Sequence, residues 1–96
     1  MQTYQSLYQN EIRAIELTIN DQDGQDFVPS AAFFAVENES GTEVVAEQAA
    51  QIVGNTVLAI IGTLVTATIG KYRIIWRLQR TGYTYYHATD LDVFSI

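Results

Sequence analysis

His87 is the only histidine of the chain and the first place to look for acid–base or nucleophilic chemistry. It lies in a tyrosine-rich run near Thr84 and Thr89, and the chain has no cysteine. A catalytic nucleophile also needs a base and an orienting group. These residues do not assemble into such a triad, and the sequence has no phosphate-binding glycine loop, dinucleotide fingerprint or paired-histidine zinc motif. We therefore expect a non-enzyme without catalytic residues, with His87 on the surface or between strands.

The acidic turn "NDQDGQD" at positions 20–26 groups hard oxygen ligands. Asp21, Asp23 and Asp26 surround Gly24, as carboxylates surround the glycine of a calcium loop. In an EF-hand frame with Gly24 at the sixth position, however, the first and twelfth positions carry no carboxylate. A solvated turn is the favoured interpretation, so we expect neither a metal nor a cofactor. A calcium-dependent adhesion module is kept as a third hypothesis.

Aromatic side chains gather between positions 72 and 86, a composition that suits stacking against a sugar or a peptide. Apolar and polar residues alternate over 71–79, which is typical of a half-buried β-strand. That alternation places Trp76 on the inward face, in the core. On the following strand Tyr83 and Tyr85 share one face and Tyr86 lies on the other, so we expect at least one exposed tyrosine. Exposed tyrosines are enriched in protein interfaces.

The net charge limits the kinds of partner. Five basic and eleven acidic residues give a formal charge of -6, whereas nucleic acids and anionic membrane surfaces reward clustered lysine and arginine. Four of the five basic residues fall between positions 71 and 80, which indicates a local basic strip on an acidic body. We expect neither a nucleic acid nor a membrane as partner, and no small-molecule ligand.

Turn signals divide the 96 residues into short strands of one domain. Residues 15–19 alternate strictly, 31–36 are apolar on both faces, and 56–64 are rich in β-branched side chains. The run 44–53 has mixed periodicity, and we interpret it as one strand with a helical alternative open. With the strands at 71–79 and beyond, the pattern predicts an all-β antiparallel sandwich of about seven strands.

Further expectations concern the domain boundaries and the location of the protein. Residues 1–11 form an N-terminal arm or a short helical turn, and the sandwich domain covers 12–96. The N-terminal segment lacks the features of a signal peptide. The most apolar window, 57–70, is shorter than the roughly 20 residues that a membrane helix needs. The cytoplasm, or assembly there into something larger, is therefore the default location.

Candidate interface residues follow from the strand faces. Phe33 and Ile75 lie on the expected outward faces of their strands, and Ile75 is flanked by Arg73 and Arg77. A single exposed apolar residue is ordinary, but several together mark a contact patch. With the aromatic and leucine residues of the arm and the tyrosine strand, the candidate interface comprises Tyr4, Leu7, Tyr8, Phe33, Arg73, Ile75, Arg77, Tyr83, Tyr85 and Tyr86.

The run "GKYRIIWRL" at 70–78 resembles the penultimate strand of immunoglobulin-like sandwiches. In that strand a tyrosine near the start forms a tyrosine corner, and Tyr72 matches it. The two cysteines that bridge the sheets of antibody domains are missing here. The resemblance therefore implies a general immunoglobulin-like sandwich rather than an antibody-type one.

More narrowly, residues 17–93 are similar to small immunoglobulin-like modules of tailed-phage virions. The shared features are a "D-x-D-G" turn, an "N-x-x-G" turn, a "G-x-Y" strand and a terminal "T-x-L-x-V" strand. The matching positions are Asp21, Asp23 and Gly24; Asn38 and Gly41; Gly70 and Tyr72; and Thr89, Leu91 and Val93.

This resemblance implies a non-catalytic structural protein of a virion, assembled in the host cytoplasm. Its expected partners are other virion proteins and copies of itself, through contacts at the capsid, neck or tail. The alternative is a carbohydrate- or peptide-binding sandwich that uses Trp76 and the exposed tyrosines.

Overall fold

The computed structural model describes residues 2–19 and 28–95, and the side chains from residue 5 onward within the first range. In these two ranges the chain forms eight strands and one short helix. The elements are β1 (Gln2–Tyr8), β2 (Arg13–Thr18), β3 (Ala31–Asn38), β4 (Glu43–Ala49), β5 (Gln51–Val53), β6 (Thr56–Ile61), α1 (Thr63–Thr66), β7 (Gly70–Arg80) and β8 (Tyr83–Phe94).

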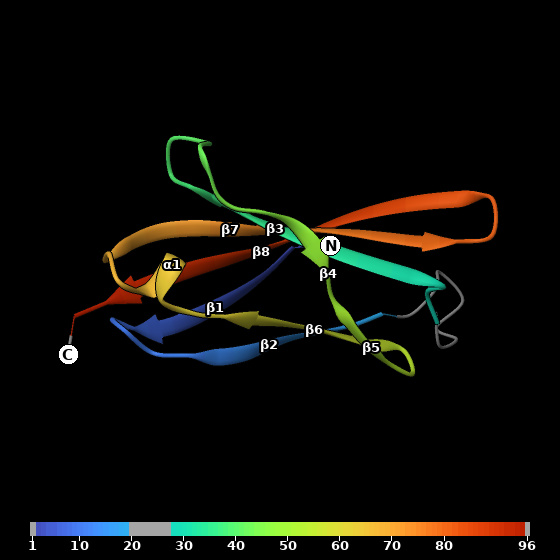
Figure 1. Cartoon of the computed structure of the whole chain (residues 1–96), viewed down its shortest axis with the longest axis horizontal. Coiled ribbons are helices and arrows are strands. Elements are labelled where there is room, and N and C mark those ends of the chain that lie inside the picture. The colour runs from blue at the N-terminus through green and yellow to red at the C-terminus, as the bar shows by residue number, and fades with distance from the viewer. Residues whose placement is uncertain (1, 20–27, 96) are drawn as a thin grey trace.

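Two sheets pack face to face (Figure 1). One has five strands in the order β1-β8-β7-β3-β4, and the other has three in the order β2-β6-β5. All pairings are antiparallel except that β1 runs parallel to β8. This order corresponds to that of immunoglobulin domains. The three-stranded sheet matches strands B (β2), E (β6) and D (β5). The larger sheet matches strands G (β8), F (β7), C (β3) and C′ (β4).

The core lies between the sheets and is centred on β7. Ile74, Trp76 and Leu78 are fully buried there, as their alternation predicts. The Trp76 ring lies 6.2 Å from that of Phe34 on the neighbouring strand β3. Its indole Nε1–H donates to the buried hydroxyl of Thr89 on β8, at 2.9 Å. Because a buried indole N–H needs a partner, this bond determines how the tryptophan sits.

A tyrosine corner closes one end of the core. The hydroxyl of Tyr72 donates to the Thr68 carbonyl oxygen at 2.8 Å, across the bend that leads into β7. In this fold the corner tyrosine stands two residues before the second bridging cysteine, and the fully buried Ile74 occupies that position here. The fold is an immunoglobulin-like β-sandwich. Apolar packing fills the space where antibody domains place a disulfide.

Three sequence-based expectations differ from the structure. Residues 2–8 are neither a free arm nor a helical turn, because they form β1 and pair along β8 from Ala88 to Phe94. Eight strands are present in the described ranges instead of about seven, and one pair is parallel. Residues 44–53 are not one strand: the chain changes sheets at Ala50, so β4 and β5 belong to different sheets.

Two further expectations concern the acidic turn and the apolar segments of the chain. The turn with Asp21, Asp23 and Asp26 lies outside the described residues. In the ranges that are described, no helix has the length and apolar character needed to cross a membrane.

We expect Tyr72→Phe to lower the free energy of unfolding by about 1 kcal/mol, because it removes one hydrogen bond from a well-packed site while keeping the ring. Urea unfolding followed by circular dichroism measures this. Tyr83→Phe, on an exposed side chain, is the matched control and should leave stability unchanged. Equal stability of the two variants would mean that the corner bond contributes nothing.

Candidate interaction surface

The outer face of the five-stranded sheet brings three predicted interface residues into one row. Phe33 on β3 pairs with Arg77 on β7, and Arg77 pairs with Tyr86 on β8. The guanidinium carbon of Arg77 lies 4.2 Å from the centroid of the Phe33 ring, a cation–π contact. Arg77 therefore lies flat against the sheet between two aromatic residues.

Glu47 on β4 holds Arg77 in this position. Its carboxylate accepts hydrogen bonds from Arg77 Nη2 at 2.6 Å and from Nε at 3.1 Å. Such a two-point contact fixes the orientation of a guanidinium as well as its distance. The hydrogen bond from Arg77, aided by its charge, lowers the pKa of Glu47 despite some desolvation, and the reverse effect raises the pKa of Arg77. Glu47 stays ionised at neutral pH, so the clamp stays closed.

Ile75 lies in the next row, between two small neighbours. Ala35 on β3 and Ala88 on β8 are its cross-strand partners. The two alanines leave the half-buried Ile75 side chain in a flat, apolar surface. We call Phe33, Ile75, Arg77 and Tyr86 the outer patch.

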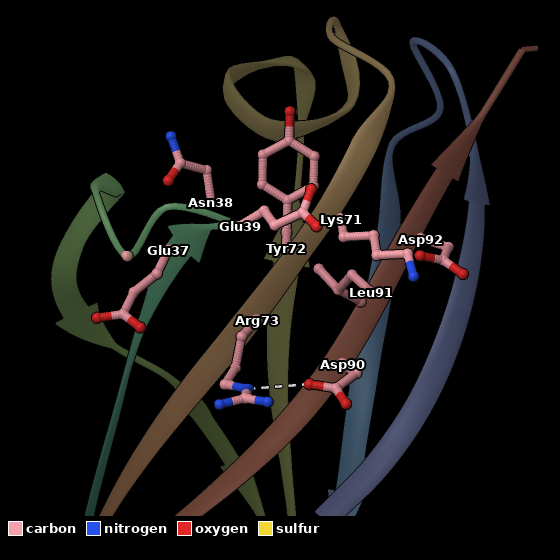
Figure 2. A pocket seen from close by; sticks show the side chains of 10 residues that line it. Glu37, Asn38, Glu39, Lys71, Tyr72, Arg73, Asp90, Leu91 and Asp92 are labelled. Carbon is pink, nitrogen blue, oxygen red and sulfur yellow. Dashed lines mark hydrogen bonds and ion pairs between the residues drawn. The ribbon is translucent and has the colours of Figure 1, made fainter.

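Arg73 does not join the outer patch, because it lies in a row of charged residues. Its Nε donates to Asp90 Oδ1 at 2.9 Å, and its other cross-strand neighbour is Glu37. This row lines a cleft of about 370 Å³ between the β3–β4 turn and strands β7 and β8. Figure 2 shows the side chains that line the cleft. The cleft mixes charges: Glu37, Glu39, Asp90 and Asp92 against Lys71 and Arg73.

The carboxylates of the cleft are not gathered as metal ligands are. Across the part of the chain that the structure describes, no group of three or more histidine, cysteine, aspartate or glutamate side chains could hold a metal ion. The side chain of Asn38 is also engaged locally, since its Oδ1 accepts the backbone N–H groups of Ser40 and Thr42 at 3.0 Å. We therefore interpret the charged row of Glu37, Arg73 and Asp90 as the polar border of the outer patch.

Tyr83 and Tyr85 lie apart from the outer patch, at the tip of the β7–β8 hairpin. Both are exposed, and their ring centroids are 6.1 Å apart. They alternate with Tyr86 along β8 and so lie on the other face of the sheet, and β1 begins only opposite Ala88. Residues 83–87 therefore pair with β7 alone, beyond the end of the neighbouring strand.

The three candidate interface residues of the N-terminal strand, Tyr4, Leu7 and Tyr8, do not share one environment. Leu7 was expected at an interface, but it is only 1% exposed and belongs to the core, because β1 pairs with β8 and turns Leu7 inward beside Val93. Tyr8 is exposed at the end of β1, opposite Phe94. Tyr4 pairs with Asp90 through the backbone, and its side chain lies outside the described part.

Trp76 is removed from any ligand-binding platform by its complete burial. His87, its cross-strand partner, is half-buried between the strands. Sequence reasoning also missed Glu47. Its distance of thirty positions from Arg77 gave no local signal, and only the sheet order brings the two together.

No family model matches this chain, and neither does any curated protein. Among solved structures, the chain is similar to a strand-swapped dimer of the immunoglobulin-like domain of mouse leukocyte-associated immunoglobulin-like receptor 1. The TM-score is 0.49 and the identity 14%, over 96% of this chain and 88% of that chain. The immunoglobulin-like assignment follows from the strand order and the tyrosine corner of this chain itself.

The Arg77–Glu47 clamp leads to a pH prediction. The folded-state pKa of Glu47 lies below its ordinary value of 4.5, so its stabilising effect is present above that value and disappears as pH falls through the folded pKa. We expect an NMR titration to find the Glu47 carboxyl shifted down, and Arg77→Gln to move it back up. Arg73→Gln, on the same strand face, should leave it where it is. A Glu47 pKa that stays the same in the Arg77→Gln variant would contradict the clamp.

Proposed function

We propose that this protein is a non-catalytic structural protein of a phage particle, and that its outer patch docks onto another virion protein. The observation that carries the docking role is Arg77, held by Glu47 across the Phe33 ring and next to Tyr86. Tyrosine and arginine are the residues most enriched at the energetic centres of protein interfaces.

Preorganisation supports this role. Ordering a free arginine on binding costs about 0.5–1.5 kcal/mol in lost side-chain freedom. Glu47 orders Arg77 before any partner arrives, and it neutralises the charge. The row therefore presents two flat planar groups and one neutralised guanidinium. This chemistry suits a partner surface that is apolar and flat, with polar groups that meet Lys71 and Arg73 at the border.

The size of the sheet face is compatible with docking. Five strands spaced about 4.8 Å apart, each contributing about eight residues of 3.3 Å, span roughly 600 Å². A stable interface buries about 800 Å² on each partner. The whole outer face of the sheet, with the outer patch on its central strands β3, β7 and β8, thus offers most of the area that a specific contact needs.

The place in a virion rests on the resemblance between the turn and strand motifs of residues 17–93 and those of phage modules. The proposal includes assembly in the host cytoplasm and contact with copies of the same chain at the capsid, neck or tail. It includes no nucleic acid, membrane or small-molecule partner.

A second candidate is a carbohydrate- or peptide-binding module at the hairpin tip. It is favoured by the exposed, neighbouring rings of Tyr83 and Tyr85, which offer faces for stacking. Without Trp76 this site has two rings on one strand, which makes it the weaker candidate.

We expect the wild-type chain, co-expressed with the structural proteins encoded beside its gene, to sediment with assembled particles in a density gradient. Tyr86→Asp should release it, because a charge then enters the middle of the outer patch. The matched control is Ile60→Asp, which adds the same charge on the other sheet at a residue of similar exposure, 61% against 64%. It should sediment like the wild type.

A wild-type chain that stays at the top of the gradient would overturn the virion role. Release by both variants would instead show that added charge, rather than the outer patch, governs attachment. Binding of a glycan or peptide array that Tyr83→Ser abolishes, without particle association, would favour the second candidate.

A further inference from the structure

Three of the four strands at the sheet edges carry ordinary protection against pairing with another chain. In the described ranges the larger sheet ends at β1 and β4, and the smaller one at β2 and β5. Proteins protect such edges with charged side chains, irregular register or short strands. Strand β4 carries Glu43 and Glu47 and is irregular against β3, β2 carries Arg13 and Glu16, and β5 has only three residues.

Strand β1 has none of these features in its own sequence. Its seven residues, QTYQSLY, include no charged residue, proline or glycine. It runs along β8 in one unbroken register, and among the described strands it pairs with β8 alone. Uncharged segments of about six or seven residues without proline are those that pair most readily with identical strands. This edge therefore needs protection from elsewhere in the chain.

The backbone groups of β1 alternate between β8 and the outer edge of the sheet. Directly after the strand, the N–H of Gln9 donates to the Phe94 carbonyl of β8 at 2.6 Å. The same alternation directs the groups of Leu7 and Gln5 toward β8. The backbone groups of Ser6 and Tyr8 are therefore directed toward the outer edge.

Two charged side chains occupy these outward backbone groups. Arg13 Nη1 donates to the Ser6 carbonyl at 3.0 Å, and the Tyr8 N–H donates to Glu11 Oε1 at 2.8 Å. The two side chains also bind each other, since Arg13 Nε donates to Glu11 Oε2 at 2.8 Å. We call Glu11 and Arg13 the edge pair.

The edge pair is supplied by the β1–β2 loop and by the other sheet. Arg13 stands on the same face of β2 as the buried Ile15 and Leu17, so its side chain is directed across to β1. An inward-directed charge is one of the ways in which proteins protect a sheet edge. The hydrogen bond from the Tyr8 N–H, together with Arg13, lowers the pKa of Glu11 despite some desolvation, so the pair is ionised at neutral pH.

We propose that the edge pair prevents β1 of one copy of this chain from pairing with β1 of another. An added strand would lie about 4.8 Å from β1 and would need its outward backbone groups as partners. The edge pair already binds the Ser6 carbonyl and the Tyr8 N–H and lies where that strand would run. The part of β1 before Ser6 is shorter than an ordinary strand of five or six residues.

A second copy is the partner that fits this edge best. Two β1 strands can run antiparallel about a two-fold axis, so that each contributes the same surface. Because residues 2–8 carry no charge, no like charges would face each other along the two backbones. Such pairing would join the two larger sheets and would cover both β1 edges, so association would end at a dimer.

The test compares the mass of the whole chain and of two variants by light scattering over a wide concentration range. The edge-pair variant carries Glu11→Ala and Arg13→Ala. The control carries Glu37→Ala and Arg73→Ala, which are cross-strand neighbours inside the same sheet. Each variant loses one acidic and one basic residue, so the net charge stays the same. We expect the edge-pair variant alone to shift toward the mass of two chains at concentrations where the wild type and the control do not.

Amide hydrogen exchange locates the contact. In the edge-pair variant, the outward amides of Tyr4, Ser6 and Tyr8 should gain protection as the concentration rises. An edge-pair variant that keeps the wild-type mass at every concentration overturns the proposal. So does a dimer in which these amides gain no protection, because its contact then lies elsewhere.

A milder variant guards against loss of the fold. Arg13→Gln keeps the hydrogen bond between Glu11 and the Tyr8 N–H, so β1 stays anchored to the loop. We expect it to dimerise at higher concentrations than the edge-pair variant, with the wild-type melting temperature. Arg73→Gln is its control and should have the wild-type mass. Equal masses of these two variants throughout would contradict the proposal.

This inference does not rest on the proposed function, since the edge pair and the outer patch share no residue. A wild type that sediments with particles, together with an edge-pair variant that never dimerises, would remove only the edge protection. An edge-pair variant that dimerises through β1, together with a wild type that stays free of particles, would remove only the virion role.

Discussion

The pairing of β7 with β8 around the buried Trp76 is the constraint on which the rest of the structure depends. The indole N–H reaches the Thr89 hydroxyl inside the core, where an unpaired donor costs about 1–3 kcal/mol. A slip of one residue between the strands would break this bond and would turn the apolar face of β7 toward solvent. The register is therefore strongly specified, and every other strand is placed relative to it.

This register also determines which side chains lie on the outer face of the sheet, where a partner can contact them. Once Trp76 points inward, Arg77 must point outward, between Phe33 on one side and Tyr86 on the other. The same alternation puts Arg73 into a row of charges, where it pairs with Asp90. The apolar patch and its charged border are thus consequences of core packing. The clamp adds a side chain from outside these three strands, Glu47 on β4.

The ends of the molecule follow from unequal strand lengths. The β7–β8 hairpin extends beyond the start of β1 at one end, where residues 83–87 pair with β7 alone and Tyr83 and Tyr85 are exposed. At the other end the β1–β2 loop, α1 and Phe94 meet over a network of backbone hydrogen bonds. Apolar side chains are exposed at both ends, among them Tyr83 and Tyr85 at one end and Ile12 and Leu64 at the other.

Local alternation in the sequence was enough to identify the strand at 71–79 and the inward position of Trp76, and the resemblance to immunoglobulin-like sandwiches indicated the corner tyrosine. Each of these depends on neighbours within a few residues, and a period of two is a local property. The outward position of Phe33, Ile75 and Arg77 followed for the same reason. Only the tertiary structure decided that residues 2–8 form a parallel edge strand with Leu7 in the core, and that 44–53 divides between two sheets. It also brought Glu47 to Arg77. These features join residues far apart in the chain, and no local pattern determines which strand edges meet.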